Sequence, residues 1–148
     1  MVELLVAKTR AGESVAQRLT TAQTLNAPYI LDGEVISALL GLMRGRKITE
    51  REAEAALSNY RAFPIERQDV LPLWPRITRL HASLSAYDAQ YVALAEALHV
   101  SLVTADARID RSGAARCGIE VFGAHPDRAP KSQVDAAGSA ASMSGRER

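Results

Sequence analysis

Apolar residues recur at helical spacing over most of the chain, and the clearest pattern begins at Ser85. From there to Leu98, apolar side chains cover most of the helical circumference, which predicts a helix packed on several sides. Ser85 followed three residues later by Asp88 has the form of a capping box, so we expect the helix to begin there. The run 100–104 is short, β-branched and bounded by polar residues, which indicates a buried strand ending just before Asp106.

Helices and strands also alternate elsewhere along the chain. We expect, in order, helices over 2–8 and 12–20, a strand over 27–31, a helix from its N-cap Asp32 to Arg44, a helix over 49–63 opened by the capping box of Thr49 and Glu52, a weak strand over 64–70, a helix over 71–81, and, after the central helix and strand, a short helix over 107–116 and a last strand over 118–122. Strands that alternate with helices predict a parallel sheet covered on both faces, an α/β fold.

The amino-acid composition changes near residue 124. The segment 124–148 is rich in Ala, Ser, Gly, Pro and charge and has no periodic apolar position. Because such a segment cannot offset the entropy of ordering, we expect a disordered C-terminal tail. No repeat or further boundary is visible, so residues 1–123 are predicted to form one domain.

Composition adds few constraints. Apolar residues make up 47% and charged residues 24% of the chain, as is ordinary for a globular domain, and the net charge of +1 argues neither for nor against nucleic acid. No apolar run approaches the length of a membrane span and no signal-peptide pattern is visible, so we expect a cytoplasmic protein without membrane contact. Cys117 is the single cysteine, which excludes an internal disulfide and a thiolate metal cluster in this sequence.

Three acids are the candidate functional residues: Glu34, Asp88 and Asp106. Each also has a structural explanation, since Glu34 suits a first helical turn and the two aspartates suit helix caps. Their shared placement at helix starts and after a strand favours function, because a parallel sheet gathers such positions along one edge. Acids held together repel one another, and a hard divalent cation such as Mg²⁺ relieves that repulsion. Such a site can activate water against a phosphodiester.

Other candidates are weaker. His81, His99 and His125 show no metal-ligand spacing, and neither a glycine-rich phosphate loop nor a serine nucleophile elbow is present. Basic residues form two groups that are either solvated surface or contacts for a phosphate backbone. These are Arg44, Arg46, Lys47 and Arg51 in the first group and Arg76 and Arg79 in the second.

Several of these stretches together resemble one family, the VapC toxins of the PIN-domain ribonucleases. The resemblance covers nearly all of residues 2–122, and its motifs lie at 28–39, 44–49, 86–98 and 102–106. It implies a three-layer α/β/α PIN-like fold with a central parallel sheet. It further implies an endoribonuclease dependent on Mg²⁺ or Mn²⁺, the toxin of a type II toxin–antitoxin pair, with RNA as substrate, a VapB-type antitoxin as partner and a homodimeric state. Glu34, Asp88 and Asp106 match three acidic metal-site positions, and Thr104 matches a polar residue that precedes the last acid.

The sequence departs from this family at its start. The family opens with a strand of the form Val-Val-Asp-Ala-Ser, whose aspartate is a principal metal ligand, and the present sequence begins after that position. We therefore expect the fold without its N-terminal strand. Asp32 is a poor substitute, because it lies two residues from Glu34 and turns to a different side of the helix.

Three functional hypotheses follow from these patterns. The chain is an active endoribonuclease that uses the three acids, an inactive PIN-like module that binds antitoxin or RNA without cleaving, or an ordinary α/β domain whose acids are only helix caps.

Overall fold

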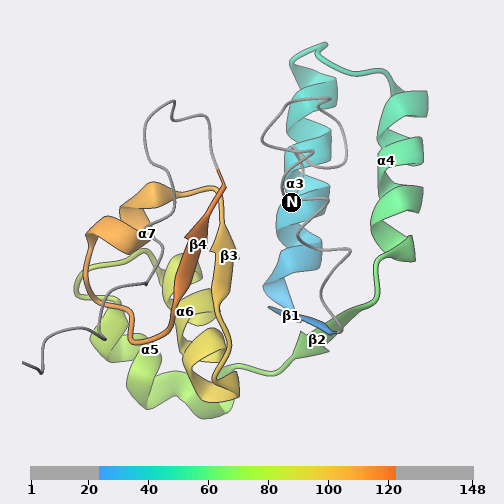
Figure 1. Ribbon diagram of the computed structural model, residues 1–148. Helices are drawn as coiled ribbons and strands as arrows, with labels where there is room; N and C mark the ends of the chain where they lie inside the picture. The colour runs from blue at the N-terminus through green and yellow to red at the C-terminus, as the bar shows by residue number, and fades with distance from the viewer. Residues whose placement is uncertain (1–23, 123–148) are drawn as a thin grey trace, which may run out of the picture.

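The structure, a computed structural model, describes residues 24–122 (Figure 1). The helices expected over 2–8 and 12–20 and the tail expected over 124–148 lie outside the described residues. The elements in chain order are β1 (Leu25–Pro28), α3 (Ile30–Arg44), α4 (Glu50–Ala62), β2 (Ile65–Gln68), the short 3-10 helix η1 (Leu71–Leu73), α5 (Trp74–Leu80), α6 (Ala86–Leu98), β3 (Leu102–Thr104), α7 (Ala107–Arg111) and β4 (Ile119–Val121). Within this part of the chain no helix is long and apolar enough to cross a membrane.

The four strands of residues 24–122 pair in parallel, as predicted. Leu25 of β1 lies opposite Ile65 of β2, and Leu102 of β3 lies opposite Ile119 of β4. The α/β class is therefore confirmed, but over residues 24–122 the strands form two separate pairs rather than the one central sheet that we predicted. The reason is that no strand of this range lies between β1 and β3 to join the pairs by backbone hydrogen bonds.

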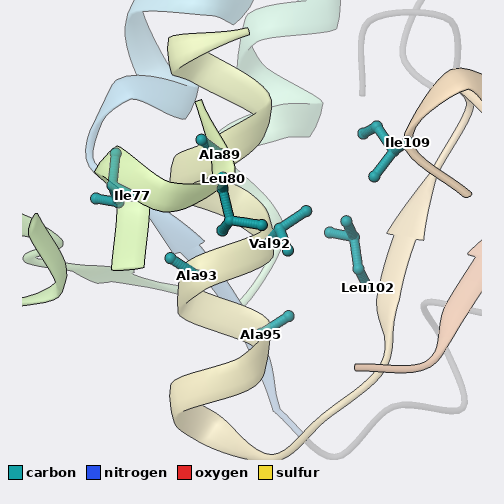
Figure 2. Close-up of a cluster of buried hydrophobic side chains, with 8 residues drawn as sticks. All are labelled: Ile77, Leu80, Ala89, Val92, Ala93, Ala95, Leu102 and Ile109. Atoms are coloured by element: carbon teal, nitrogen blue, oxygen red, sulfur yellow. The ribbon is translucent and has the colours of Figure 1, made fainter. Parts of the chain in front are cut away.

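Helix α6 connects the two pairs by side-chain packing. Figure 2 shows its small residues between Ile77 of α5 on one side and Leu102 of β3 on the other, and α6 also contacts β1. Its buried residues are Ala89, Val92, Ala93, Leu94 and Ala95. This arrangement confirms the prediction of a helix packed on several sides. The helix ends at His99, whose φ of 56° places it in the left-handed conformation that terminates many helices.

A second hydrophobic cluster joins α3, α4 and the β1–β2 pair. Its largest members are Leu31 and Leu39 of α3, Tyr60 of α4 and Ile65 of β2, all of them buried. Tyr91 of α6 packs against this cluster and also against the one around α6. One aromatic side chain therefore links the two halves of the described fold.

The start of α3 differs from the prediction. Strand β1 ends at Pro28, and Tyr29 already has helical angles of φ −51° and ψ −28°, so the helix begins at Ile30. The proline ring restricts φ and removes a backbone donor, which favours ending a strand there over extending it to Leu31. Asp32 is consequently not the N-cap, and its carboxylate contacts side chains of other elements instead.

The start of α4 follows the prediction. The Thr49 hydroxyl accepts the backbone N–H of Glu52 at 3.3 Å, and the Glu52 carboxylate accepts the backbone N–H of Thr49 at 2.7 Å. Both bonds of the capping box are therefore present, and they satisfy backbone donors that a helix leaves unpaired at its start.

Candidate metal site

The three candidate acids lie where the elements change direction. Glu34 is on the second turn of α3, soon after β1, while Asp88 is in the first turn of α6 and Asp106 is the N-cap of α7, directly after β3. All three are partly buried. In Figure 1, helix α7 follows the carboxyl end of β3, and α6 runs alongside the same strand pair.

Asp106 is held by its own helix. Its Oδ1 accepts the backbone N–H of Arg108 at 2.8 Å, which confirms its role as a helix cap. The Arg108 guanidinium also donates to both carboxylate oxygens, at 2.5 to 3.0 Å. The hydrogen bonds from the Arg108 side chain lower the pKa of Asp106. Thr104 accepts the backbone N–H of Asp106 at 3.0 Å and so fixes the turn that follows β3.

Asp88 is held by the serine that caps its helix. The Ser85 hydroxyl accepts the backbone N–H of Asp88 at 3.1 Å and donates to Asp88 Oδ2 at 2.7 Å. The charge of Asp88 also reaches Arg108: hydrogen bonds to Asp106 are the main cause of the raised pKa of that guanidinium, and Asp88 adds a smaller contribution. The direct contacts of Arg108 are with Asp106.

Glu34 has its partner on α6. The Tyr91 hydroxyl donates a short hydrogen bond to Glu34 Oε2 across 57 positions of sequence. Burial, and secondly this hydrogen bond to Glu34, raise the pKa of Tyr91. The phenol therefore stays protonated and acts as the donor. The two residues join the helix that carries Glu34 to the helix that carries Asp88.

Asp32 has a separate set of partners. Its Oδ1 accepts the Tyr60 hydroxyl at 2.5 Å and Arg67 Nη2 at 2.9 Å. The Arg67 guanidinium also lies over the Tyr60 ring, 5.3 Å from its centroid. The hydrogen bonds from Arg67 and then Tyr60 lower the pKa of Asp32, whereas burial and the bond to Asp32 raise the pKa of Tyr60 to about 12. Asp32 is thus engaged by a cation away from Glu34.

Comparison with known proteins identifies the family. The family model described as PIN domain matches residues 1–114. Ribonuclease VapC9 of Mycobacterium tuberculosis is 42% identical over 110 residues, which cover 74% of this chain and 87% of the relative. The chain belongs to the VapC-type PIN-domain family. Ribonuclease VapC12 of the same species is 35% identical over 120 residues, covering 81% of this chain and 92% of the relative. No solved structure gave a significant match.

The donor chemistry of this VapC-type chain suits a hard divalent cation, because carboxylate oxygens are the ligands that such ions prefer. The geometry is less complete. Among the residues that the structure describes, no group of three or more His, Cys, Asp or Glu side chains is close enough to hold a metal ion. A joint site formed by Glu34, Asp88 and Asp106 therefore stays a prediction.

The other candidates divide into exposed and engaged residues. Arg44, Arg46, Lys47 and Arg51 are exposed, as are His81 and His99, while His125 lies outside the described residues. Arg76 is engaged, because its guanidinium donates to Glu96 at 2.6 Å, and this removes it as a free phosphate contact. Burial raises the pKa of the Cys117 thiol, which favours a structural role.

Sequence reasoning missed Tyr91 and Arg108 as neighbours of the acids in this VapC-type site. Arg108 lies two residues after Asp106, so an ion pair between these two side chains could have been predicted from the sequence. The sequence indicated Tyr91 only as an apolar position of α6, because its hydrogen-bond partner Glu34 belongs to a helix far away along the chain.

Proposed function

We propose that this VapC-type chain is the toxin of a type II toxin–antitoxin pair and hydrolyses phosphodiester bonds of RNA as an endoribonuclease. The observation that carries the proposal is the 42% identity to a protein named as a VapC ribonuclease, over 87% of that protein. Ribonuclease VapC1 of Mycobacterium tuberculosis, 36% identical over 115 residues, supports the same activity. The match of the PIN domain model, residues 1–114, spans all three candidate acids.

The proposal assigns Mg²⁺ or Mn²⁺ to Glu34, Asp88 and Asp106. Such an ion, when bound, supplies positive charge against the phosphodiester and activates water. The chain contributes three carboxyl groups: Asp88 and Asp106 are at capped helix starts, and Glu34 is on the second turn of α3. The Arg108 guanidinium already pairs with Asp106, and this pairing supports the proposal that the start of α7 is a place where a cation is favourable.

The proposed partners are RNA, a VapB-type antitoxin and a second copy of the chain. Exposed cations at the end of α3 and in the loop after it, Arg44, Arg46 and Lys47, have the charge needed to bind an RNA backbone. Because the RNA and such an antitoxin are cytoplasmic molecules, the proposed place of action is the cytoplasm.

Cleavage of RNA by the purified full chain tests the activity. We expect products in the presence of Mg²⁺ or Mn²⁺ and none with EDTA. Asp88→Asn is expected to lower the rate by about 100-fold or more, since it removes an anionic ligand. Glu54→Gln, which removes one charge from an exposed position on α4, is the control and should cleave at the wild-type rate. Cleavage that is insensitive to EDTA or to Asp88→Asn would contradict the proposed mechanism.

A second function is favoured by one specific observation. Arg108 occupies both carboxylate oxygens of Asp106, and no three acids of the described range are gathered as metal ligands. A chain in this state could act as an inactive PIN-like module that binds antitoxin or RNA without cleaving. The same experiment separates the two functions, because the inactive module would retard labelled RNA in a gel and release no fragments with either metal ion.

A further inference from the structure

Two tyrosines contact two acids on the first turns of α3, but they do so in different settings. Tyr60 donates to Asp32, whose carboxylate is also paired with Arg67. Tyr91 donates to Glu34, for which the described part of the chain shows no cationic partner. A neutral hydroxyl orients a carboxylate without cancelling its charge, whereas a guanidinium does both. Glu34 is therefore oriented by a neutral group.

The Tyr91 ring has little freedom to move. It is partly buried and packs against both hydrophobic clusters of the described fold. Packing on two sides determines where the hydroxyl points, and that point is Glu34 Oε2. The other oxygen of this carboxylate has no hydrogen-bond partner within residues 24–122, so it is the one left for a ligand.

Tyr91 also lies one helical turn after Asp88. Residues three apart on a helix are neighbours on its surface, so α6 presents Asp88 and the hydroxyl that holds Glu34 from adjacent positions. The distance between these two acids is thereby tied to one rigid helix. Without this hydrogen bond, the position of Glu34 relative to Asp88 would depend on how α3 and α6 move relative to each other.

We propose that Tyr91 is a positioning residue, which aims the Glu34 carboxylate at the divalent cation and couples it to Asp88. This inference rests on the proposed function, in which Glu34 and Asp88 hold Mg²⁺ or Mn²⁺. Ligating carboxylates are commonly oriented by a second hydrogen-bonded residue, and loss of that residue weakens metal binding or activity by about 10- to 100-fold. Tyr91 acts through Glu34 and does not touch substrate.

The test compares Tyr91→Phe with Tyr60→Phe in the full chain. Both variants remove one hydroxyl from a tyrosine that donates to an acid of α3, and only the first touches Glu34. Titration calorimetry with Mn²⁺ is expected to show a Kd raised by about 10-fold in Tyr91→Phe and by less than about twofold in Tyr60→Phe. Excess Mn²⁺ should restore RNA cleavage by Tyr91→Phe, with KM for RNA unchanged.

The Glu34→Gln variant makes the outcomes distinguishable. If Glu34→Gln weakens Mn²⁺ binding and Tyr91→Phe does not, the inference about Tyr91 is overturned and the metal site stands. If wild type binds no Mn²⁺ and cleaves no RNA, the proposed function and the inference fall together. In a chain that already carries Glu34→Gln, Tyr91→Phe should have no further effect on Mn²⁺ affinity. A further loss of Mn²⁺ affinity in the double variant would overturn the inference that Tyr91 acts through Glu34.

A spectroscopic readout covers the case in which Tyr91→Phe does not fold. Addition of Mg²⁺ to the Tyr60→Phe chain should change the near-ultraviolet absorption of tyrosine, because a cation on Glu34 alters the hydrogen bond that Tyr91 donates. This change should be absent when Glu34→Gln is added. Mg²⁺ binding that leaves the tyrosine spectrum unchanged would overturn the inference.

Discussion

Replacing Glu96 by glutamine tests the ion pair that joins α5 to α6. Arg76 Nε donates to Glu96 Oε2 at 2.6 Å, and Arg76 Nη2 donates to Oε1 at 2.8 Å. The backbone N–H of Arg116 donates to the same Oε1 at 2.8 Å, and Arg76 Nη2 also donates to the Ala114 carbonyl at 2.9 Å. One carboxylate therefore ties two helices to the loop before β4.

The burial of this pair sets the expected magnitude. The Arg76 and Glu96 side chains are 21% and 13% exposed. Removing one partner of a fully buried pair costs about 3–5 kcal/mol, whereas exposed pairs contribute about 1 kcal/mol or less. Since water reaches both groups to a small extent, we expect Glu96→Gln to lower the free energy of unfolding by about 2 kcal/mol. The corresponding fall in Tm is roughly 8 °C for a chain of this size.

The pH dependence follows from the pKa of Glu96, which the hydrogen bonds from Arg76 lower below its ordinary value of 4.5. The folded state therefore holds this carboxylate ionised at a pH where the unfolded state protonates it. Its contribution to stability is complete above the unfolded pKa and is lost as the pH falls through the lower folded pKa. Wild type and Glu96→Gln should differ most at neutral pH and converge in acid.

Urea unfolding followed by circular dichroism measures this difference at pH 7 and again below pH 4. Glu54→Gln is the matched control, because Glu54 is exposed on α4. The control should change the free energy of unfolding by less than about 0.5 kcal/mol. An equal loss of stability for Glu96→Gln at both pH values, or a loss at pH 7 no larger than that of the control, would refute the reasoning.

Three further predictions concern a helix cap, the core and the candidate site. Thr49→Ala removes the capping box of α4 and should cost about 1 kcal/mol in chemical unfolding, and an unchanged midpoint would argue against the cap. Leu80→Ala empties a site that is 1% exposed and should cost about 2–5 kcal/mol, whereas Leu71→Ala, at 79% exposed, should be nearly neutral in the same assay. Arg108→Ala removes the cation that competes with a metal ion for Asp106, so calorimetry should show tighter Mn²⁺ binding. Weaker Mn²⁺ binding would contradict this competition and would mean that Arg108 supports the metal site.

Local signals account for the parts of the fold that were predicted well. The capping signatures at Thr49 and Ser85 marked the starts of α4 and α6, because each cap hydroxyl accepts the backbone N–H of a residue only three positions later. The predicted strand over 27–31 has Pro28 near its beginning, whereas β1 ends at Pro28. A proline excludes the strand interior but does not by itself say which side of it the strand occupies.

Local sequence signals could not predict which strands pair with each other. The register of β1 with β2 joins residues 40 positions apart, as Leu25 and Ile65 illustrate. The hydrogen bonds that would merge the two pairs depend on which segments lie side by side, and periodicity carries no information on that. The parallel direction was predictable because helices connect the strands, whereas the division into two pairs was not.

The sequence by itself determined which acids are the candidates, where their helices begin and to which family the chain belongs, because motifs and caps are encoded within a few neighbouring residues. Only the tertiary structure decided what each acid contacts. Asp32 is paired with Arg67 across 35 positions, and Glu34 accepts from Tyr91 across 57. Arg67 reaches Asp32 because its strand β2 pairs with β1, the strand that leads into α3, and Tyr91 reaches Glu34 because it packs against the cluster that contains α3. Such packing is set by the whole core rather than by any local pattern.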